Sequence, residues 1–303
     1  MKITVSMIKR NVKMFFKDKA LFFTSLITPL ILFVLYMTFL GNVYKDSLVS
    51  SLPEWVTLDG KVINAYVGGQ LTSSILAVSC ITVAFCSNML MVQDKANGTI
   101  NDLRMAPVPS YVLSISYYAA TFISTLIVCF VATAVCLVYT AIIGWYLSFL
   151  DVLLIILDVL LLVMLGTVIS SIVGYFLSSQ GQISAVGSIV SSCYGFISGA
   201  YMPISQFSPT LQKIISFLPG TYGTSLLRNH SMRGVFEELD KSGIPDEFVS
   251  EVKNIVDCNV YFFETNVPVG AKYLILAASV ILLLAAYIAL NSLGSKPRKS
   301  ARK

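Results

Sequence analysis

Apolar residues gather in six long runs along this chain, with polar segments between them. Each run is close to the roughly 20 residues that a helix needs to cross a hydrocarbon layer about 30 Å thick. The runs cover residues 21–40, 62–92, 111–145, 152–177, 183–202 and 273–290, and none has Lys or Arg in its central part. Unpaired backbone amides are costly in lipid, and no run alternates like a barrel strand. We therefore predict an all-α integral membrane protein with six transmembrane helices.

The composition agrees with this class. Of the 303 residues, 56% are hydrophobic and 12% are charged, whereas soluble domains carry about a quarter charged residues. No GxxxxGK[ST] loop occurs, so the chain lacks the P-loop that cradles the phosphates of ATP. Residues 1–303 are predicted to form one transmembrane domain without a nucleotide-binding domain, and no nucleic-acid partner is expected.

Basic residues are distributed unevenly between the loops. Six precede the first run, five lie in the tail SKPRKSARK, and the loop between the second and third runs adds Lys95 and Arg104. The short loops on the other side hold Lys45 and Lys61. Since cytoplasmic loops collect Lys and Arg, both termini are predicted to be cytoplasmic in a plasma-membrane protein, with residues 203–272 outside. A cleaved signal peptide is the alternative for the first run, but its apolar region would span only about 7 to 15 residues.

Residues 1–19 form a basic arm with one apolar face. Met1, Val5, Ile8, Val12 and Phe15 recur at helical spacing, and basic residues occupy much of the rest. This pattern is typical of an interfacial helix lying on an anionic membrane surface. A basic flank that only sets topology would fit as well.

Residues 93–109 are a polar interlude between two apolar runs. Thr99 and Asp102 fit the capping box [ST]-x-x-[DE], Gly98 precedes the cap and Pro107 stops the helix. We expect a short cytoplasmic helix over about residues 100–106. A helix this short is marginal alone and needs something to dock on; a simple capped turn between spans is the alternative. Its contacts would come from apolar Ile100 and Leu103 and polar Asp94, Lys95, Asn101 and Arg104.

Small residues recur every four positions in the fifth run, at Gly187, Ser191, Gly195 and Gly199. Such a stripe lets another helix approach closely. The neighbour can belong to the same bundle or to a second copy of the chain.

The outer segment, residues 203–272, contains two stretches typical of short helices. In SPTLQKIISFLP, Ser208 can cap the helix, Pro209 suits its first position and Pro219 lies beyond its end. Its apolar side is expected to dip into the outer leaflet. The stretch PDEFVSEVKNIVDC has apolar residues at helical spacing and predicts a second amphipathic helix.

Asp158 is the candidate intramembrane acid, about two turns into the fourth run. A charge at the bilayer centre costs about 2.5 to 3.5 kcal/mol. It is therefore either a shallow carboxylate near the outer interface or a proton or substrate contact. The only histidine, His230, has no acidic residue close in sequence, which indicates a structural surface residue, and Asn229 begins a glycosylation sequon. Five of the six cysteines lie within the runs and no Cys/His metal spacing occurs. No catalytic, cofactor-binding or metal site is expected, and the chain is predicted not to be an enzyme.

Two stretches together resemble the type 2 ATP-binding-cassette permeases. DKANGTINDLRMAPVPSYVLSISY resembles that family's inner loop, and FISGAYMPISQFSPTLQKIISFLPGTYGTSLLR resembles the segment that ends its fifth span. The likeness covers nearly the whole chain. The run Gln93, Asp94 and Lys95 is less acidic than in many relatives, and the outer segment is longer than in small drug exporters.

The resemblance implies the membrane subunit of an ATP-driven exporter. The arm and the inner loop would be connecting and coupling helices that ride on a separate ATPase subunit, present twice per transporter, which binds ATP and Mg²⁺. The coupling contacts would be Asp94, Gly98, Thr99, Ile100, Asp102, Leu103 and Arg104. The outer gate would include Pro203, Pro209 and Pro219, and the small-residue stripe would face the pathway and a second permease chain, the same or homologous.

Two other functions remain open. One is an ATP-independent, proton-linked transporter that uses Asp158, and the other is a membrane sensor or immunity protein that binds a toxin through the outer segment. The cargo does not follow from the residues.

Overall fold

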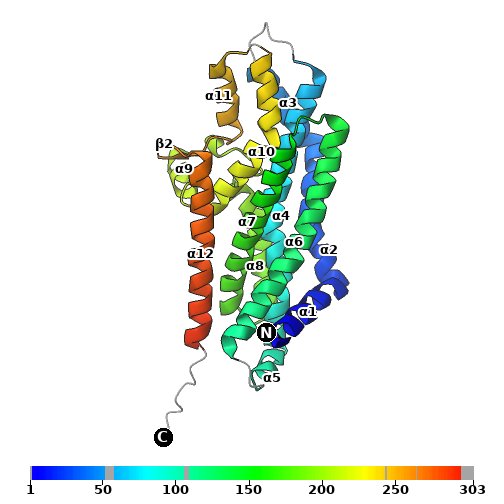
Figure 1. The fold of residues 1–303 in the computed structure, drawn as a ribbon, viewed down its shortest axis with the longest axis vertical. Coiled ribbons are helices and arrows are strands. Elements are labelled where there is room, and N and C mark those ends of the chain that lie inside the picture. The colour runs from blue at the N-terminus through cyan, green and yellow to red at the C-terminus, as the bar shows by residue number, and fades with distance from the viewer. Residues whose placement is uncertain (1, 52–57, 106–108, 243, 264, 295–303) are drawn as a thin grey trace.

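The computed structural model describes residues 2–51, 58–105, 109–242, 244–263 and 265–294, and helices dominate it (Figure 1). The long helices and the segments that continue them are α1 (Lys2–Lys17), α2 (Lys19–Leu35), a π-helical turn (Tyr36–Leu40), α3 (Gly41–Ser51), α4 (Gly60–Ala96), α6 (Ser110–Ile143), α7 (Phe149–Phe176), α8 (Gln180–Ile197), α10 (Pro219–Lys241) and α12 (Val269–Gly294). The shorter elements are α5 (Thr99–Met105), a 3₁₀ turn (Ile204–Gln206), α9 (Pro209–Ile215), α11 (Asp246–Ile255) and the antiparallel strands β1 (Tyr261–Phe262) and β2 (Thr265–Asn266).

Five helical segments are long and apolar enough to cross a membrane: Lys19–Ser50, Gly60–Ala96, Tyr111–Ile143, Phe149–Phe176 and Val269–Ser292. The prediction of an all-α membrane protein is confirmed. The helix α8 takes the place of the predicted fifth span, but it has 18 residues, many of them Ser or Gly, and is not among the five. The count of six spans therefore remains a prediction.

The helix α4 forms the centre of the bundle, and α2, α6, α7, α8 and α10 pack around it (Figure 1). In its most apolar window, 89% of the residues are buried. Small residues bring the neighbours close: a Cβ added at Gly166 of α7 would lie 2.7 Å from the carbonyl oxygen of Cys80, and one at Gly69 would lie 2.8 Å from that of Ser231. Close approach of helix backbones at small residues is typical of membrane helices, whereas soluble cores are packed by large apolar side chains.

The helix α10 is the main feature of the outer segment that the sequence does not predict. It has 23 residues and packs against α4, α7 and α12. Pro219, expected beyond the end of α9, is the first residue of α10, a position that suits proline. Its glycines allow close packing, since a Cβ at Gly223 or Gly234 would overlap Leu162 or the backbone of Tyr146.

The two ends of the molecule differ in what they contain. The helices α3, α10 and α11 gather at one end, and α1, α5 and the last turns of α12 lie at the other (Figure 1). If the latter end is cytoplasmic, as the basic residues predict, the former lies outside. The tail from residue 295 lies outside the described residues.

Candidate functional site

The helix α5 is anchored to the bundle by one buried side chain. Ile100 is 6% exposed and lies in a cluster with Met7 of α1, Met91 of α4 and residues of α6. Leu103, one turn later, packs against the same cluster. This agrees with the expectation that a helix of seven residues needs a docking surface.

The helix begins at Thr99 itself, one residue earlier than the capping-box pattern indicates. Gly98 has a φ of 78°, in the left-handed region that favours glycine. Its carbonyl accepts the first helical hydrogen bond, from the amide of Asp102 at 3.4 Å. Gly98 therefore occupies the position before the helix, and Thr99 lies in the first turn.

Asp94 lies inside the protein, and its predicted contact with a partner stays a prediction. It is 4% exposed. Its Oδ2 accepts a hydrogen bond from Tyr117 Oη at 2.5 Å and lies 3.0 Å from Nη1 of Arg10. We call Arg10, Asp94 and Tyr117 the inner clamp, because it joins α1, α4 and α6. Partial burial acts to lower the pKa of Arg10, but Asp94 raises it overall.

Lys95 ties the same end of α4 to α7. Its Nζ donates to the carbonyl oxygens of Gly174 and Tyr175 at 2.7 and 2.9 Å, at the carboxyl end of α7. A cation in this position donates hydrogen bonds to carbonyl oxygens that have no partner within the helix, and it interacts favourably with the negative end of the helix dipole. Asp94 and Lys95, neighbours in the last turn of α4, thus join α4 to α1, α6 and α7. The sequence reasoning missed Arg10 and Tyr117 because neither is near Asp94 in the chain.

Two side chains of α5 are exposed among those that the structure describes. Asp102 is exposed, and Met105 is 79% exposed; the side chain of Arg104 lies outside the described part. Met105 was not among the predicted contacts. An exposed thioether at the tip of a docked helix is suited to an adaptable protein contact.

The small-residue stripe divides into an open half and a filled half. A Cβ at Gly187 would meet nothing within 4 Å, whereas one at Gly195 would overlap the ring of Tyr201. Gly199 lies beyond α8, with a φ of 76°, and its carbonyl accepts a hydrogen bond from Arg228. The part around Gly187 therefore leaves room for a neighbouring helix.

The three predicted gate prolines each precede or begin a helical segment. Pro203 comes directly before the 3₁₀ turn, and Pro209 and Pro219 are the first residues of α9 and α10. The amide of Ile204 donates to Asp257 Oδ2 at 2.8 Å, which ties this turn to the loop after α11. The predicted gate region is therefore hydrogen-bonded to the loop after α11.

A buried polar cluster holds the outer end together. Arg228 of α10 has a fully buried side chain, 3.0 Å from Asp257 Oδ2, and donates to the carbonyls of Val256 and Gly199. The carbonyl of Cys258 accepts from Ser225, Asn229 and Lys272 at 2.9, 2.6 and 2.7 Å. We call Arg228, Asp257, Ser225, Asn229 and Lys272 the outer cluster.

The packing of the outer cluster also determines the surroundings of Asn229, one of its members, and of Cys258. The amide of Asn229 is already bonded, so the predicted sequon is occupied by an internal contact. Burial raises the pKa of the Cys258 thiol to about 12, which makes it a poor nucleophile in the folded protein.

Asp158 has two partners, one of which corrects the interpretation of His230. Its Oδ2 lies 2.6 Å from His230 Nδ1, and its Oδ1 accepts from Tyr273 Oη at 2.6 Å. His230 is 6% exposed rather than a surface residue, and its acidic partner is 72 residues away in the chain. Tyr273 lies in the second turn of α12, so Asp158 is near the outer end of its span, as in the shallow-carboxylate interpretation.

The comparisons with known proteins agree with this architecture. No curated protein matches the chain. The family model for the ABC-2 type transporter matches residues 4–230, a stretch that contains the inner clamp, α5 and about half of α10. The chain therefore belongs to the ABC-2 type transporters, and it carries the permease domain of a type 2 ABC transporter.

Proposed function

We propose that this permease is the membrane subunit of an ATP-driven exporter and that α5 is the element moved by its ATPase partner. The observation that carries the proposal is the anchoring of α5. Ile100 buries α5 against α1, α4 and α6, and the last turn of α4, which leads into α5, is joined to α1, α6 and α7 through the inner clamp and Lys95. A displacement of α5 is thereby passed to several helices.

The complex that follows has two ATPase subunits, which bind ATP and Mg²⁺, and a second permease chain, the same or homologous. The subunit lies in the plasma membrane with both termini in the cytoplasm. Coupling requires that α5 contact the ATPase differently in its open and closed states, because a partner shifts a conformational equilibrium only by its differential affinity.

The double substitution Thr99→Ala with Asp102→Ala tests the coupling role. We expect the variant to insert normally and to lose transport and cargo-stimulated ATP hydrolysis. Both are measured with the copurified ATPase in proteoliposomes. Asp246→Ala, an exposed acidic residue on α11, is the matched control and should behave as the parent. Survival of both activities in the double variant would contradict the proposal.

The proton-linked alternative depends on Asp158. This residue is buried, and both carboxylate oxygens already have partners, which favours a structural role. Transport without nucleotide that disappears in Asp158→Asn would support the alternative instead. The toxin-binding alternative predicts that deletion of residues 245–258 abolishes ligand capture.

A further inference from the structure

The hairpin β1–β2 and the helix α9 lie at the level of the membrane boundary. Val269–Ser292 is a candidate span of 24 residues, about 36 Å at 1.5 Å per residue, slightly more than a hydrocarbon layer of about 30 Å. Its first turn therefore lies near the outer surface of the lipid. The hairpin ends at Asn266, directly before this turn, and α9 lies beside it (Figure 1).

Three aromatic side chains are exposed at this level. Phe217, Phe262 and Phe263 are 64%, 38% and 54% exposed. Their rings contact one another, with centroids 5.2 Å apart for Phe217 and Phe262 and 5.0 Å apart for Phe262 and Phe263. We call them the aromatic cluster. It is close in sequence to the exposed face of α12, where Leu274 is 72% exposed.

Membrane lipid accounts for this exposure. An apolar surface in water is unfavourable, whereas aromatic rings are enriched where lipid headgroups meet the hydrocarbon. The cluster precedes a membrane span, so lipid rather than a soluble protein is its expected neighbour.

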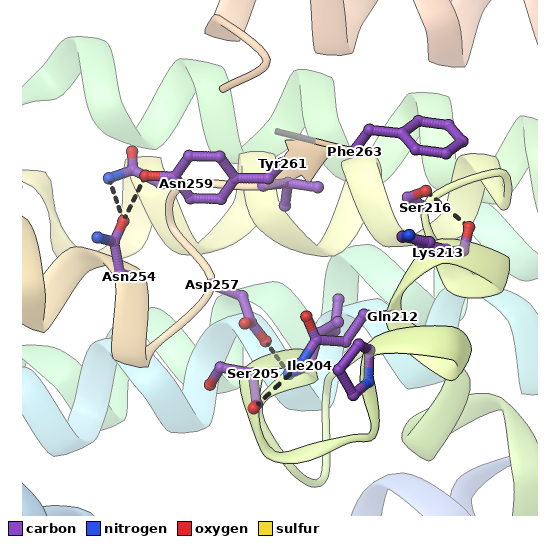
Figure 2. A pocket seen from close by; sticks show the side chains of 12 residues that line it. Ile204, Ser205, Gln212, Lys213, Ser216, Asn254, Asp257, Asn259, Tyr261 and Phe263 are labelled. Carbon is purple, nitrogen blue, oxygen red and sulfur yellow. Dashed lines mark hydrogen bonds between the residues drawn. The ribbon is translucent and has the colours of Figure 1, made fainter. Parts of the chain in front are cut away.

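A cavity of about 420 Å³ lies beside the cluster, with Phe263 in both (Figure 2). Its wall combines polar and aromatic side chains. Gln212 and Lys213 come from α9, Asn254 and Asn259 from α11 and the loop after it, and Tyr261 from β1. The volume suits a small ligand.

The charge that faces the cavity is positive. Asp257 also lines it but is paired with Arg228 at 3.0 Å. Lys213 has no ion pair among the described residues, and its Nζ lies 5.8 Å from the ring centroid of Phe263. Its charge is therefore available to an anion.

The amide groups supply further donors. Oδ1 of Asn254 accepts from Asn259 Nδ2 at 2.8 Å and from Tyr261 Oη at 3.3 Å, which fixes the wall (Figure 2). Nδ2 of Asn254 then has no hydrogen-bond partner among the described residues. A cation and an amide donor beside a lipid-level aromatic cluster match a phosphate group that is attached to acyl chains.

We propose that this cavity binds the headgroup of an anionic phospholipid of the outer leaflet. Lys213 pairs with the phosphate, the amides bond the polar part of the headgroup, and the acyl chains run past the aromatic cluster along α12. The site is separate from α5, and the proposal does not depend on coupling to an ATPase.

Quenching of a tryptophan at the hairpin tests this site. Phe262→Trp is prepared in the full chain and placed in nanodiscs that contain phosphatidylcholine and increasing brominated phosphatidylglycerol or brominated phosphatidylcholine. The parent protein, with its two native tryptophans, serves as the blank. We expect quenching by both lipids, with phosphatidylglycerol effective at a concentration about fivefold lower, as one lysine near a lipid surface predicts. Phe217→Trp provides a second reporter if the first variant does not fold.

The contribution of Lys213 is measured in the same background. Lys213→Gln should remove the preference for phosphatidylglycerol. Lys241→Gln should keep this preference. Lys241 is also a lysine of the outer segment, but it does not line the cavity, and its Nζ pairs with Glu238 at a distance of 3.3 Å. Absence of quenching, equal quenching by the two lipids, or a preference that survives Lys213→Gln would overturn the proposal. A preference abolished by millimolar inorganic phosphate would assign the site to a soluble phosphorylated ligand instead.

Discussion

The inner clamp and the outer cluster both pair an arginine with an aspartate, but they differ in burial. The Arg10 side chain is 34% exposed, whereas that of Arg228 is fully buried. Arg10 can turn to water when its pair opens, and Asp94 keeps its hydrogen bond from Tyr117, so separation costs less than it would at Arg228. Arg228 has no such choice, because a buried charge without its partner is strongly destabilising.

This difference in burial indicates that the two ends have different roles in the proposed exporter. Interactions that open at low cost are placed where a partner has to move α5. Interactions that are costly to break hold α10 to the loops after α8 and α11, around the proposed gate. A movement that begins at the inner end can then tilt helices without dismantling the outer end.

The largest expected effect comes from Arg228→Met. It leaves Asp257 buried and unpaired and removes two bonds to backbone carbonyls, so we expect a loss of about 3–5 kcal/mol in the free energy of unfolding. Denaturant unfolding in detergent micelles measures it. Unchanged stability would contradict the structural role of the outer cluster.

Two variants sharpen this result. Lys241→Met removes a cation of the same helix whose side chain is 71% exposed and pairs with Glu238, and it should cost at most about 1 kcal/mol. Adding Asp257→Asn to Arg228→Met should recover part of the loss, because the unpaired charge is gone. Asn also tolerates the left-handed backbone at this position, where φ is 54°.

The next effect concerns the inner clamp. Asp94→Asn weakens the contacts with Arg10 and Tyr117, and we expect a loss of about 1–2 kcal/mol, smaller than at Arg228. Under the proposed function, transport per ATP hydrolysed should fall more than stability does. Asp240→Asn, an exposed residue of α10, is the control. A fall in stability as large as that of Arg228→Met would remove the contrast between the two ends.

The spans could be predicted because length and hydropathy alone decide them, as the runs over α4, α6 and α7 illustrate. The helix α10 could not. Its sequence, PGTYGTSLLRNHSMRGVFEELDK, has no apolar stripe, and Gly223 and Gly234 bury it by close approach instead. Only the positions of α7 and of the loop before it show that these glycines are needed.

The polar contacts were harder to predict for another reason. Asp94 stands in a polar stretch of the sequence and was therefore predicted to lie at the surface. In the structure it belongs to the last turn of α4, which directs its side chain into the bundle. Arg228 and Asp257 are 29 residues apart, and Asp158 and His230 are 72 apart. Such pairs depend on how helices align, and no local pattern encodes that alignment.

An effect on stability of similar size is expected at the contact between α7 and α12. Tyr273→Phe removes one of the two hydrogen bonds to Asp158 and leaves His230 in place. We expect a loss of about 1–2 kcal/mol, since the acceptor is a carboxylate. Tyr111→Phe, at a position that is 52% exposed, should be neutral, and both are compared by denaturant unfolding. Equal stability of the two variants would show that the Tyr273 contact contributes nothing.

The smallest effect on stability, and the sharpest test of the inner end, is expected for Met105→Ser. Met105 is 79% exposed, so its loss should change the free energy of unfolding by less than about 0.5 kcal/mol. Burial of the thioether in the ATPase would contribute about 1.5 kcal/mol or more to binding, which corresponds to association roughly tenfold weaker in the variant. Titration of the nanodisc-embedded permease with the labelled ATPase measures this affinity. Asn97→Ser, an exposed residue of the same loop, should bind like the parent, and equal affinity of both variants would exclude the tip of α5 as the partner contact while leaving the inner clamp intact.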